Sequence, residues 1–254
     1  MAAAFSVLEY NLVSYRRTWR GSALSSFVLP VLFVLGFGIS VGSMVNTGKI
    51  GGTSYLSYIA PGMIASTAMQ IGIGESTFPV MAKFQWIRTY HSMYAAPLSI
   101  GAIVGGDMIF VLLRVVSSCA VFLGVTALFG AAHSWWSLVV PLLAGLIGLA
   151  FATPVYALAG TVQDANAFAF VQRFAIIPMS LFSGVFFPVS SLPVVLQWLA
   201  YVSPLWHGVV LSRVAMGVEP GNTLADVGHL AYLALWAGVG YWLVLRAFRR
   251  KLSD

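Results

Sequence analysis

The sequence predicts an all-α membrane protein with six transmembrane helices, and three observations lead to this fold class. Of its 254 residues, 59% are hydrophobic and only 8% are charged, whereas a soluble domain carries about a quarter charged residues. A spanning helix needs about 20 apolar residues, so the chain has room for about six spans with short loops. Its 11 prolines and 25 glycines are tolerated in membrane helices, where neighbouring helices satisfy the freed backbone groups. This composition excludes an ordinary soluble enzyme, a disordered tail and a secreted disulfide module.

The first 20 residues predict an amphipathic helix in the membrane interface rather than a signal peptide. Apolar side chains recur every three or four residues, at Phe5, Leu8, Leu12, Tyr15 and Trp19. Polar and charged side chains lie off this stripe, at Glu9, Asn11, Arg16, Arg17 and Arg20. An apolar stripe opposite a basic face is typical of helices that rest on a bilayer. The alternative is a plain, positively charged flank of the first span.

Six apolar stretches follow, separated by loops that contain turn residues. The predicted spans are residues 22–44, 56–80, 99–130, 137–161, 167–187 and 227–246. Residues 187–222 are also apolar, but four prolines interrupt them: Pro188, Pro193, Pro204 and Pro220. Because no uninterrupted piece of this segment can cross a bilayer, we expect a re-entrant pair of short helices there. Gly101 and Gly105 in the third span form a small-residue pair that predicts a close helix contact within the chain.

Lysines and arginines near the span ends are distributed unevenly, and this predicts the orientation of the chain in a cytoplasmic (inner) membrane. Ten lie on one side, namely Arg16, Arg17, Arg20, Lys83, Arg88, Arg173, Arg246, Arg249, Arg250 and Lys251. Two, Lys49 and Arg213, are assigned to the opposite side. Both termini and the loop 81–97 are therefore expected in the cytoplasm, and residues 187–222 outside. Residues 1–254 are expected to form one transmembrane domain that contacts the lipid bilayer, and the net charge of +6 does not indicate a nucleic-acid partner.

No catalytic residue and no metal site are predicted. The single Gly-Lys pair, Gly48-Lys49, is followed by Ile50 and lacks the Walker A pattern, so this chain is not expected to bind ATP by that route. Four histidines fall in separate segments without metal-ligand spacing, at His91, His133, His207 and His229. Each is expected to be a polar interface residue rather than a ligand.

Three ionisable residues lie deeper inside predicted spans than Arg173, which is in the first turns of the fifth span. Glu75 lies in the second span, and Asp107 and Arg114 lie seven residues apart on one face of the third. A charged side chain in hydrocarbon is costly unless it is paired or hydrated, so all three are expected to face the bundle interior. Two interpretations stay open: a polar cluster that fixes helix packing, or the lining of a translocation path or gate.

Aromatic residues near the expected external end are further candidates for the translocation path. They are Phe182, Phe186, Phe187 and Trp206. They could form an apolar gate, and the alternative is ordinary anchoring of aromatic rings at the membrane interface.

The loop 81–97 predicts a short amphipathic helix held in the cytoplasm between two spans. Phe84, Ile87, His91 and Tyr94 recur at helical spacing, and polar residues that include Lys83 and Arg88 lie between them. Such a helix can dock into a groove of a cytoplasmic partner. The alternative is an interfacial helix that rests on lipid.

Several segments, in this order along the chain, resemble the membrane subunits of ABC-2 type exporters. They are Tyr15–Ser22, Ile59–Gly62, Gly74–Thr77, Arg88–His91, Ala96–Ser99, Ser183–Pro188, Leu192–Pro193 and Ser203–His207. Within that superfamily the resemblance points to the branch of nodulation-type lipo-oligosaccharide and anthracycline-resistance permeases. The segments cover nearly the whole chain.

The resemblance implies a coupling helix at residues 83–96, in which Lys83, Phe84, Ile87, Arg88, His91 and Tyr94 would contact the partner. It also implies a separately encoded ATPase that holds ATP and Mg²⁺ and is present in two copies, and a second permease copy or close relative. This chain would then have no cofactor of its own. It would export an amphipathic, lipid-linked or drug-like molecule. The alternative is an ion-coupled secondary transporter or channel without an ATPase partner.

Overall fold

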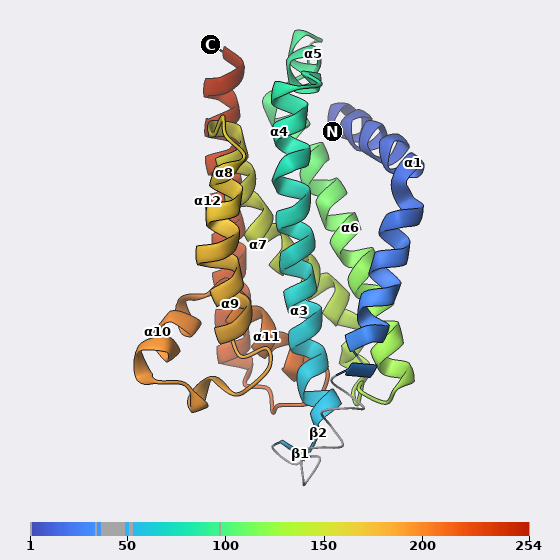
Figure 1. Ribbon diagram of the computed structural model, residues 1–254, viewed down its shortest axis with the longest axis vertical. Helices are drawn as coiled ribbons and strands as arrows, with labels where there is room; N and C mark the ends of the chain where they lie inside the picture. Colours follow the sequence, from blue (N-terminus) through green and yellow to red (C-terminus); the bar gives the residue numbers. More distant parts are fainter. Residues whose placement is uncertain (1, 34, 37–48, 51–52, 97, 254) are drawn as a thin grey trace.

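A computed structural model describes residues 2–33, 35–36, 49–50, 53–96 and 98–253, and most of this part is helical. The helices pack side by side along one long axis (Figure 1). In chain order the longer ones are α1 (Ala2–Phe33), α3 (Tyr55–Ser76), α6 (Ile100–Leu128), α7 (Val140–Thr161) and α12 (Thr223–Ser253). The shorter ones are α4 (Phe78–Gln85), α5 (Thr89–Ala95), α8 (Asn166–Val171), α9 (Ile177–Phe182), α10 (Val194–Val202) and α11 (Pro204–Ala215).

Short elements complete the architecture. The strands β1 (Lys49–Ile50) and β2 (Thr53–Ser54) form an antiparallel pair, with Lys49 opposite Ser54. A 3₁₀ turn (Trp135–Val139) precedes α7, another (Val189–Ser191) precedes α10, and a π-helical turn (Gln172–Ile176) joins α8 to α9. Both chain termini and α5 lie at one end of the bundle, which we call the terminal end (Figure 1). The strands and α10 lie at the opposite end.

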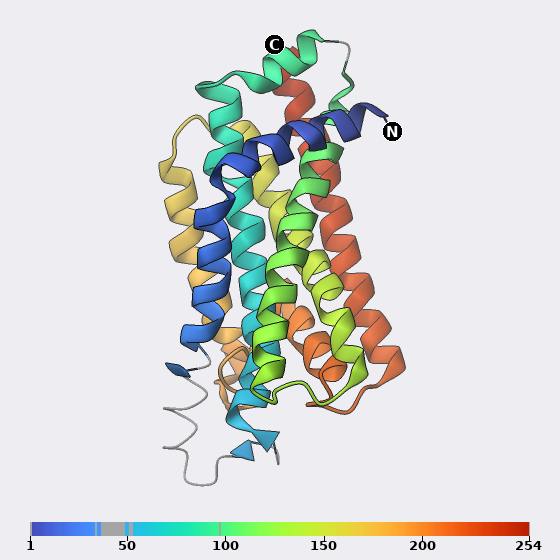
Figure 2. The same ribbon diagram turned by 90° about the vertical axis from the view of Figure 1, so that its right-hand side faces the viewer.

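The helix α1 combines the predicted interfacial helix with the start of the first span. Its first part lies across the terminal end of the bundle, and the rest runs along the long axis (Figure 2). Phe5, Leu12 and Trp19 of the predicted stripe are exposed, whereas Leu8 is buried. Asn11, which we expected on the polar outer face, is buried at 5% exposure because its amide binds a carboxylate inside the bundle. The last part of the first predicted span falls on residues that lie outside the described ranges.

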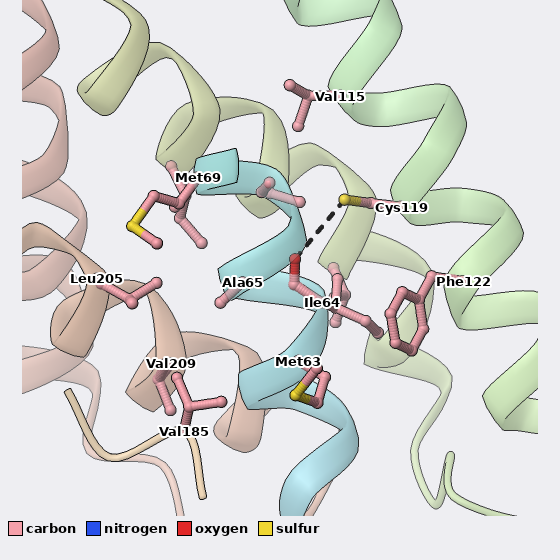
Figure 3. Close-up of a cluster of buried hydrophobic side chains, with 14 of the residues drawn as sticks. Met63, Ile64, Ala65, Met69, Val115, Cys119, Phe122, Val185, Leu205 and Val209 are labelled. Carbon is pink, nitrogen blue, oxygen red and sulfur yellow. Dashed lines mark hydrogen bonds between the residues drawn. The ribbon is translucent and has the colours of Figure 1, made fainter. Parts of the chain in front are cut away.

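The main hydrophobic core surrounds α3, which packs against α6, α7 and α11. Figure 3 shows side chains from these helices converging, and the Cys119 thiol of α6 donates to the Ile64 carbonyl of α3 at 3.7 Å. Where α3 crosses α7, a Cβ atom on Gly72 would come within 2.4 Å of the Gly148 carbonyl oxygen. Only glycine allows this approach of two backbones.

The expected close contact at Gly101 and Gly105 is wrong. A Cβ atom on Gly101 would meet nothing within 4 Å, and one on Gly105 would meet only a tyrosine hydroxyl at 3.8 Å. The close approach uses the next residue, Gly106, whose Cβ would lie 2.6 Å from the Ala4 carbonyl oxygen and from Val7 of α1. The face of α6 turned toward α1 is thus one residue away from the expected one.

Within the described ranges, three helices are by themselves long and apolar enough to cross a membrane, namely Ile100–Leu128, Trp135–Thr161 and Thr223–Leu252. The fifth predicted span corresponds to the shorter helical segment Asn166–Phe182, which ends five residues before the expected boundary. The prolines of 187–222 separate α10 from α11, which meet at an angle of 81° and would count as a fourth crossing only if the bent pair were one span. The number of six spans stays a prediction.

Candidate functional site

The segment expected to form one amphipathic helix is broken in two. The helix α4 continues the course of α3 and ends at Gln85, and α5 starts only at Thr89. Between them Arg88 has a φ of +54°, in the left-handed region that L-residues other than glycine rarely adopt. Trp86 and Ile87 in this turn are 67% and 65% exposed. The single helix at 83–96 is therefore corrected to two helices joined by an exposed turn.

This break separates the predicted coupling residues into two groups. Lys83 and Phe84 belong to α4 and point into the bundle, where Phe84 is 2% exposed and packs against Tyr90 and Phe248. The other four are exposed at the terminal end, namely Ile87, Arg88, His91 and Tyr94. Only this second group lies where another protein can contact it.

Asp107 on α6 is the centre of a buried polar cluster and is 2% exposed. Its Oδ1 accepts from the Asn11 amide at 2.6 Å and from Lys83 Nζ at 2.9 Å. Its Oδ2 accepts from the Tyr90 hydroxyl at 2.7 Å and from the Tyr156 hydroxyl. One carboxylate thus joins α1, α4, α5, α6 and α7.

Tyr90 is the link from this cluster to α5. Burial, together with the neighbouring Asp107 carboxylate, raises the pKa of Tyr90 well above the ordinary tyrosine range. Its hydroxyl therefore keeps its proton and remains a donor at physiological pH. The aromatic ring is fully buried beside Phe84 and Phe248, so α5 is anchored to the bundle by both packing and a hydrogen bond.

A second ion pair lies on the same side of α6. Arg114 Nε is 3.1 Å from Glu75 Oε1, and Arg114 Nη1 donates to the Tyr15 hydroxyl at 2.6 Å. The guanidinium also lies 4.5 Å from the centre of the Tyr15 ring. Asp107 and Arg114 share a helix face, and each has its own partner of opposite charge on α3 or α4.

A cavity of about 370 Å³ lies between the two ion pairs. Its lining consists of Asn11, Ser14, Tyr15, Thr18, Glu75, Pro79, Lys83, Asp107, Phe110, Val111, Arg114 and Tyr156. All three ionisable residues singled out in the spans thus meet at one cavity. The two cations and two carboxylates compensate one another, so the cavity can hold water or the polar part of a ligand that carries no large net charge.

The opposite end of the bundle contains another cavity, of about 460 Å³. Its lining includes Tyr58, Trp206, Arg213 and Glu219. Arg213 was expected as a peripheral charge, but it is buried at 5% exposure. Its Nη2 donates to the Gly184 carbonyl at 2.5 Å, and its Nη1 lies 3.4 Å from Glu219 Oε1.

Of the predicted gate aromatics, only Trp206 lines this cavity. Phe182 ends α9, and Phe186 and Phe187 lie in the irregular segment that follows it, where all three are partly exposed. Among the described residues, no group of three or more His, Cys, Asp or Glu side chains is arranged to hold a metal ion.

Comparison with known proteins identifies the family. A family model described as "ABC-2 type transporter" matches residues 3–216. The chain belongs to the ABC-2 type transporter family. This membership favours a transporter subunit over the ion-coupled alternative considered from the sequence.

Relatives of this ABC-2 chain match it over almost its whole length. "Nodulation protein J" of Rhizobium leguminosarum bv. viciae is 32% identical over 251 residues, which cover 97% of this chain and 94% of the relative. "Nodulation protein J" of Neorhizobium galegae is 30% identical over 252 residues, covering 98% and 94%. "Inner membrane transport permease YadH" of Escherichia coli K12 is 25% identical over 254 residues, covering 91% and 92%.

Sequence reasoning missed three members of the Asp107 cluster of this ABC-2 subunit. Asn11 was assigned to an outer face, and Tyr90 and Tyr156 were not singled out. Tyr156 carried a usable signal, because a polar side chain within an apolar span usually pairs with another one. For Asn11 and Tyr90 the pairing depends on how α1 and α5 fold back on the bundle, which helical spacing does not contain.

Proposed function

We propose that this chain is the membrane-spanning subunit of an ATP-driven exporter and works with a separate cytoplasmic ATPase that holds ATP and Mg²⁺. The terminal end faces the cytoplasm, because most of the basic residues belong to segments near that end. The chain resides in the inner membrane, in agreement with the name of its Escherichia coli relative. Two copies of the ATPase and a second permease copy complete the transporter.

The ATPase docks on α5 and the turn before it. Trp86 and Ile87 present large apolar surface there, next to the basic side chain of Arg88 and the exposed ring of Tyr94. Aromatic residues and arginine are enriched in the centres of protein interfaces. This exposed group stands at the end of the molecule that a cytoplasmic partner reaches.

The observation that carries the proposal is the hydrogen bond of 2.7 Å between the Tyr90 hydroxyl and Asp107. Because Tyr90 belongs to α5 and Asp107 to α6, a displacement of α5 by the partner acts directly on the helix that lines the charged cavity. Closure of two ATPases would in this way rearrange the spans of two permease copies. An amphipathic, lipid-linked or drug-like molecule then leaves toward the outside, past the apolar and aromatic residues of the opposite end.

The test begins with a pull-down of the tagged full chain in mild detergent. A soluble protein with a Walker A loop, recovered at about one per permease, supports the proposal, and recovery of a stable permease alone contradicts it. Ile87→Asp and Arg88→Glu are expected to lose the partner at least tenfold, whereas Arg88→Lys keeps it. Lys83 is unsuitable for this test, because charge reversal there would also break its ion pair with Asp107.

Tyr90→Phe separates docking from transmission. It keeps the buried ring but removes the hydroxyl, so the partner should bind normally while ATP-dependent export falls. Export at the unaltered rate in vesicles that contain the Tyr90→Phe complex would refute the transmission step. Tyr10→Phe, which removes an exposed hydroxyl from α1 outside the docking surface, is the matched control and should export normally.

A further inference from the structure

Two histidines that the sequence places 22 residues apart meet at the opposite end of the bundle. His207 Nδ1 of α11 lies 2.6 Å from His229 Nδ1 of α12. The other ring nitrogen of His207, Nε2, lies 3.0 Å from the Tyr201 carbonyl oxygen. The sequence assigned both histidines to the polar interface, and their contact with each other was not expected.

These contacts determine where the protons are. A carbonyl oxygen only accepts, so His207 Nε2 must carry the proton that Tyr201 receives. In neutral His207 the Nδ1 atom is then an acceptor, and His229 Nδ1 must donate to it. The free nitrogen of His229 is Nε2, which can take up one further proton without breaking the contact.

A second added proton has no free nitrogen to bind outside the contact. It must enter at His207 Nδ1, and two N–H groups would then face each other between two imidazolium rings. Like charges and opposed donors at this distance repel, so the contact between α11 and α12 is lost.

The surroundings provide little compensation for two positive charges. Asp226, one turn before His229 on α12, offers one negative charge for two added protons. The Tyr232 ring of α12 stacks on His207 at 4.0 Å, and its hydroxyl donates to the Val202 carbonyl of α10. On α11 the charge of Arg213 is already paired with Glu219. Both imidazole rings are partly exposed, so protons from solution can reach them.

We propose that the contact between His207 and His229 is proton-controlled. It holds α11 to α12 until the pair takes up its second added proton. The histidine pair lies directly behind one wall of the opposite-end cavity, since the centre of the Trp206 ring is 4.9 Å from that of His207 and 5.1 Å from that of His229. Acidification therefore releases α11, together with the cavity residues Trp206 and Arg213 that it carries. This inference goes beyond the proposed function and needs no ATPase.

The experiment measures the separation of the two elements as the pH falls. Spin labels are attached to cysteines at Val202, which is 60% exposed and directly precedes the N-cap of α11, and at Leu224 of α12, which is 84% exposed. The full chain is used, with Cys119→Ala. The distance distribution is recorded in lipid nanodiscs between pH 7.5 and pH 3.5, because burial and the neighbouring His229 lower the pKa of His207 to about 4. We expect it to lengthen at the acidic end, with a midpoint below about pH 6.5, the ordinary value of imidazole.

Two variants decide the assignment. In His229→Gln the amide N–H still donates to His207 but the side chain cannot be protonated, so the acid-induced lengthening should disappear. His207→Gln also prevents the pair from carrying two positive charges. It replaces His229→Gln if that variant fails to fold. His91→Gln, in the exposed α5, should respond like the unaltered chain. A shift that persists in both pair variants, or no shift in the unaltered chain, would overturn the proposal.

Discussion

Replacing Asp107 by asparagine should show how much the buried cluster contributes to stability. The Asp107 side chain is 3% exposed and that of its partner Lys83 is 18% exposed. Removing one partner of a buried ion pair costs about 3–5 kcal/mol, because the remaining charge is left uncompensated. Lys83 Nζ still donates to the side-chain oxygen of Asn11 at 2.8 Å, so we expect the lower end of this range, about 3 kcal/mol.

The geometry shows why asparagine cannot replace the carboxylate. Four donors converge on Asp107, two on each oxygen, so either orientation of an amide turns its NH₂ group toward two of them. The tyrosine hydroxyls can turn to accept, but Lys83 cannot. The loss is therefore mainly electrostatic, and Lys83→Met combined with Asp107→Asn should recover most of it.

The assay measures unfolding of the full chain in mixed detergent micelles, with tryptophan fluorescence as the signal. Glu9→Gln is the control, because Glu9 is an exposed carboxylate on α1 and should change the free energy of unfolding by less than about 0.5 kcal/mol. The reasoning fails if Asp107→Asn matches the control. It also fails if the double variant is no more stable than Asp107→Asn alone.

Three further changes test local geometry by thermal unfolding. Gly240→Ala places a Cβ atom 2.1 Å from Thr153 Oγ1 and should cost about 1–3 kcal/mol, whereas Gly238→Ala meets nothing within 4 Å and should be neutral or stabilising by up to about 1 kcal/mol. Arg88→Gly should leave stability within about 1 kcal/mol, since the left-handed strain it removes offsets the added chain entropy, and Arg88→Val should be clearly destabilising. Arg213→Met removes a buried cation and leaves the carbonyl that it binds unpaired, so we expect a loss of about 1–3 kcal/mol.

For each of these three changes, one outcome would contradict the structure. Equal effects of alanine at 238 and 240 would mean that α12 is rotated relative to α7. A large loss with Arg88→Gly would show that the turn before α5 does not have a left-handed residue. An unchanged melting temperature for Arg213→Met would mean that its guanidinium is hydrated rather than buried.

The sequence predicted which residues face the interior better than it predicted their partners. Glu75, Asp107 and Arg114 were expected inside the bundle because unpaired charges are expensive there, and all three line one cavity. That Lys83 neutralises Asp107 was not expected, because the amphipathic spacing of 81–97 favoured an outer helix. Burial of charge is a property of one helix face, whereas pairing depends on how several helices meet.

The break at 86–88 and the contact at Gly106 escaped prediction for related reasons. The turn contains neither glycine nor proline, and Arg88 adopts its left-handed conformation without a local signal. Glycine spacing identified α6 as a helix that can be approached closely, but not which of its faces meets α1. Gly105 and Gly106 are consecutive, so they point in different directions around the helix axis. Tertiary packing alone determines which of the two faces α1.

The order of charges along the chain has a consequence for biogenesis. Lys83 precedes Asp107 by 24 residues, and Glu75 precedes Arg114 by 39. Because synthesis proceeds from the N-terminus, α6 enters the bilayer when the counter-ion of each of its charges has already been made. Asn11 and Tyr90 also precede Asp107, and only Tyr156 arrives later. The third span can therefore insert as a neutral unit with α3 and α4, and α7 closes a cluster whose charges are already balanced.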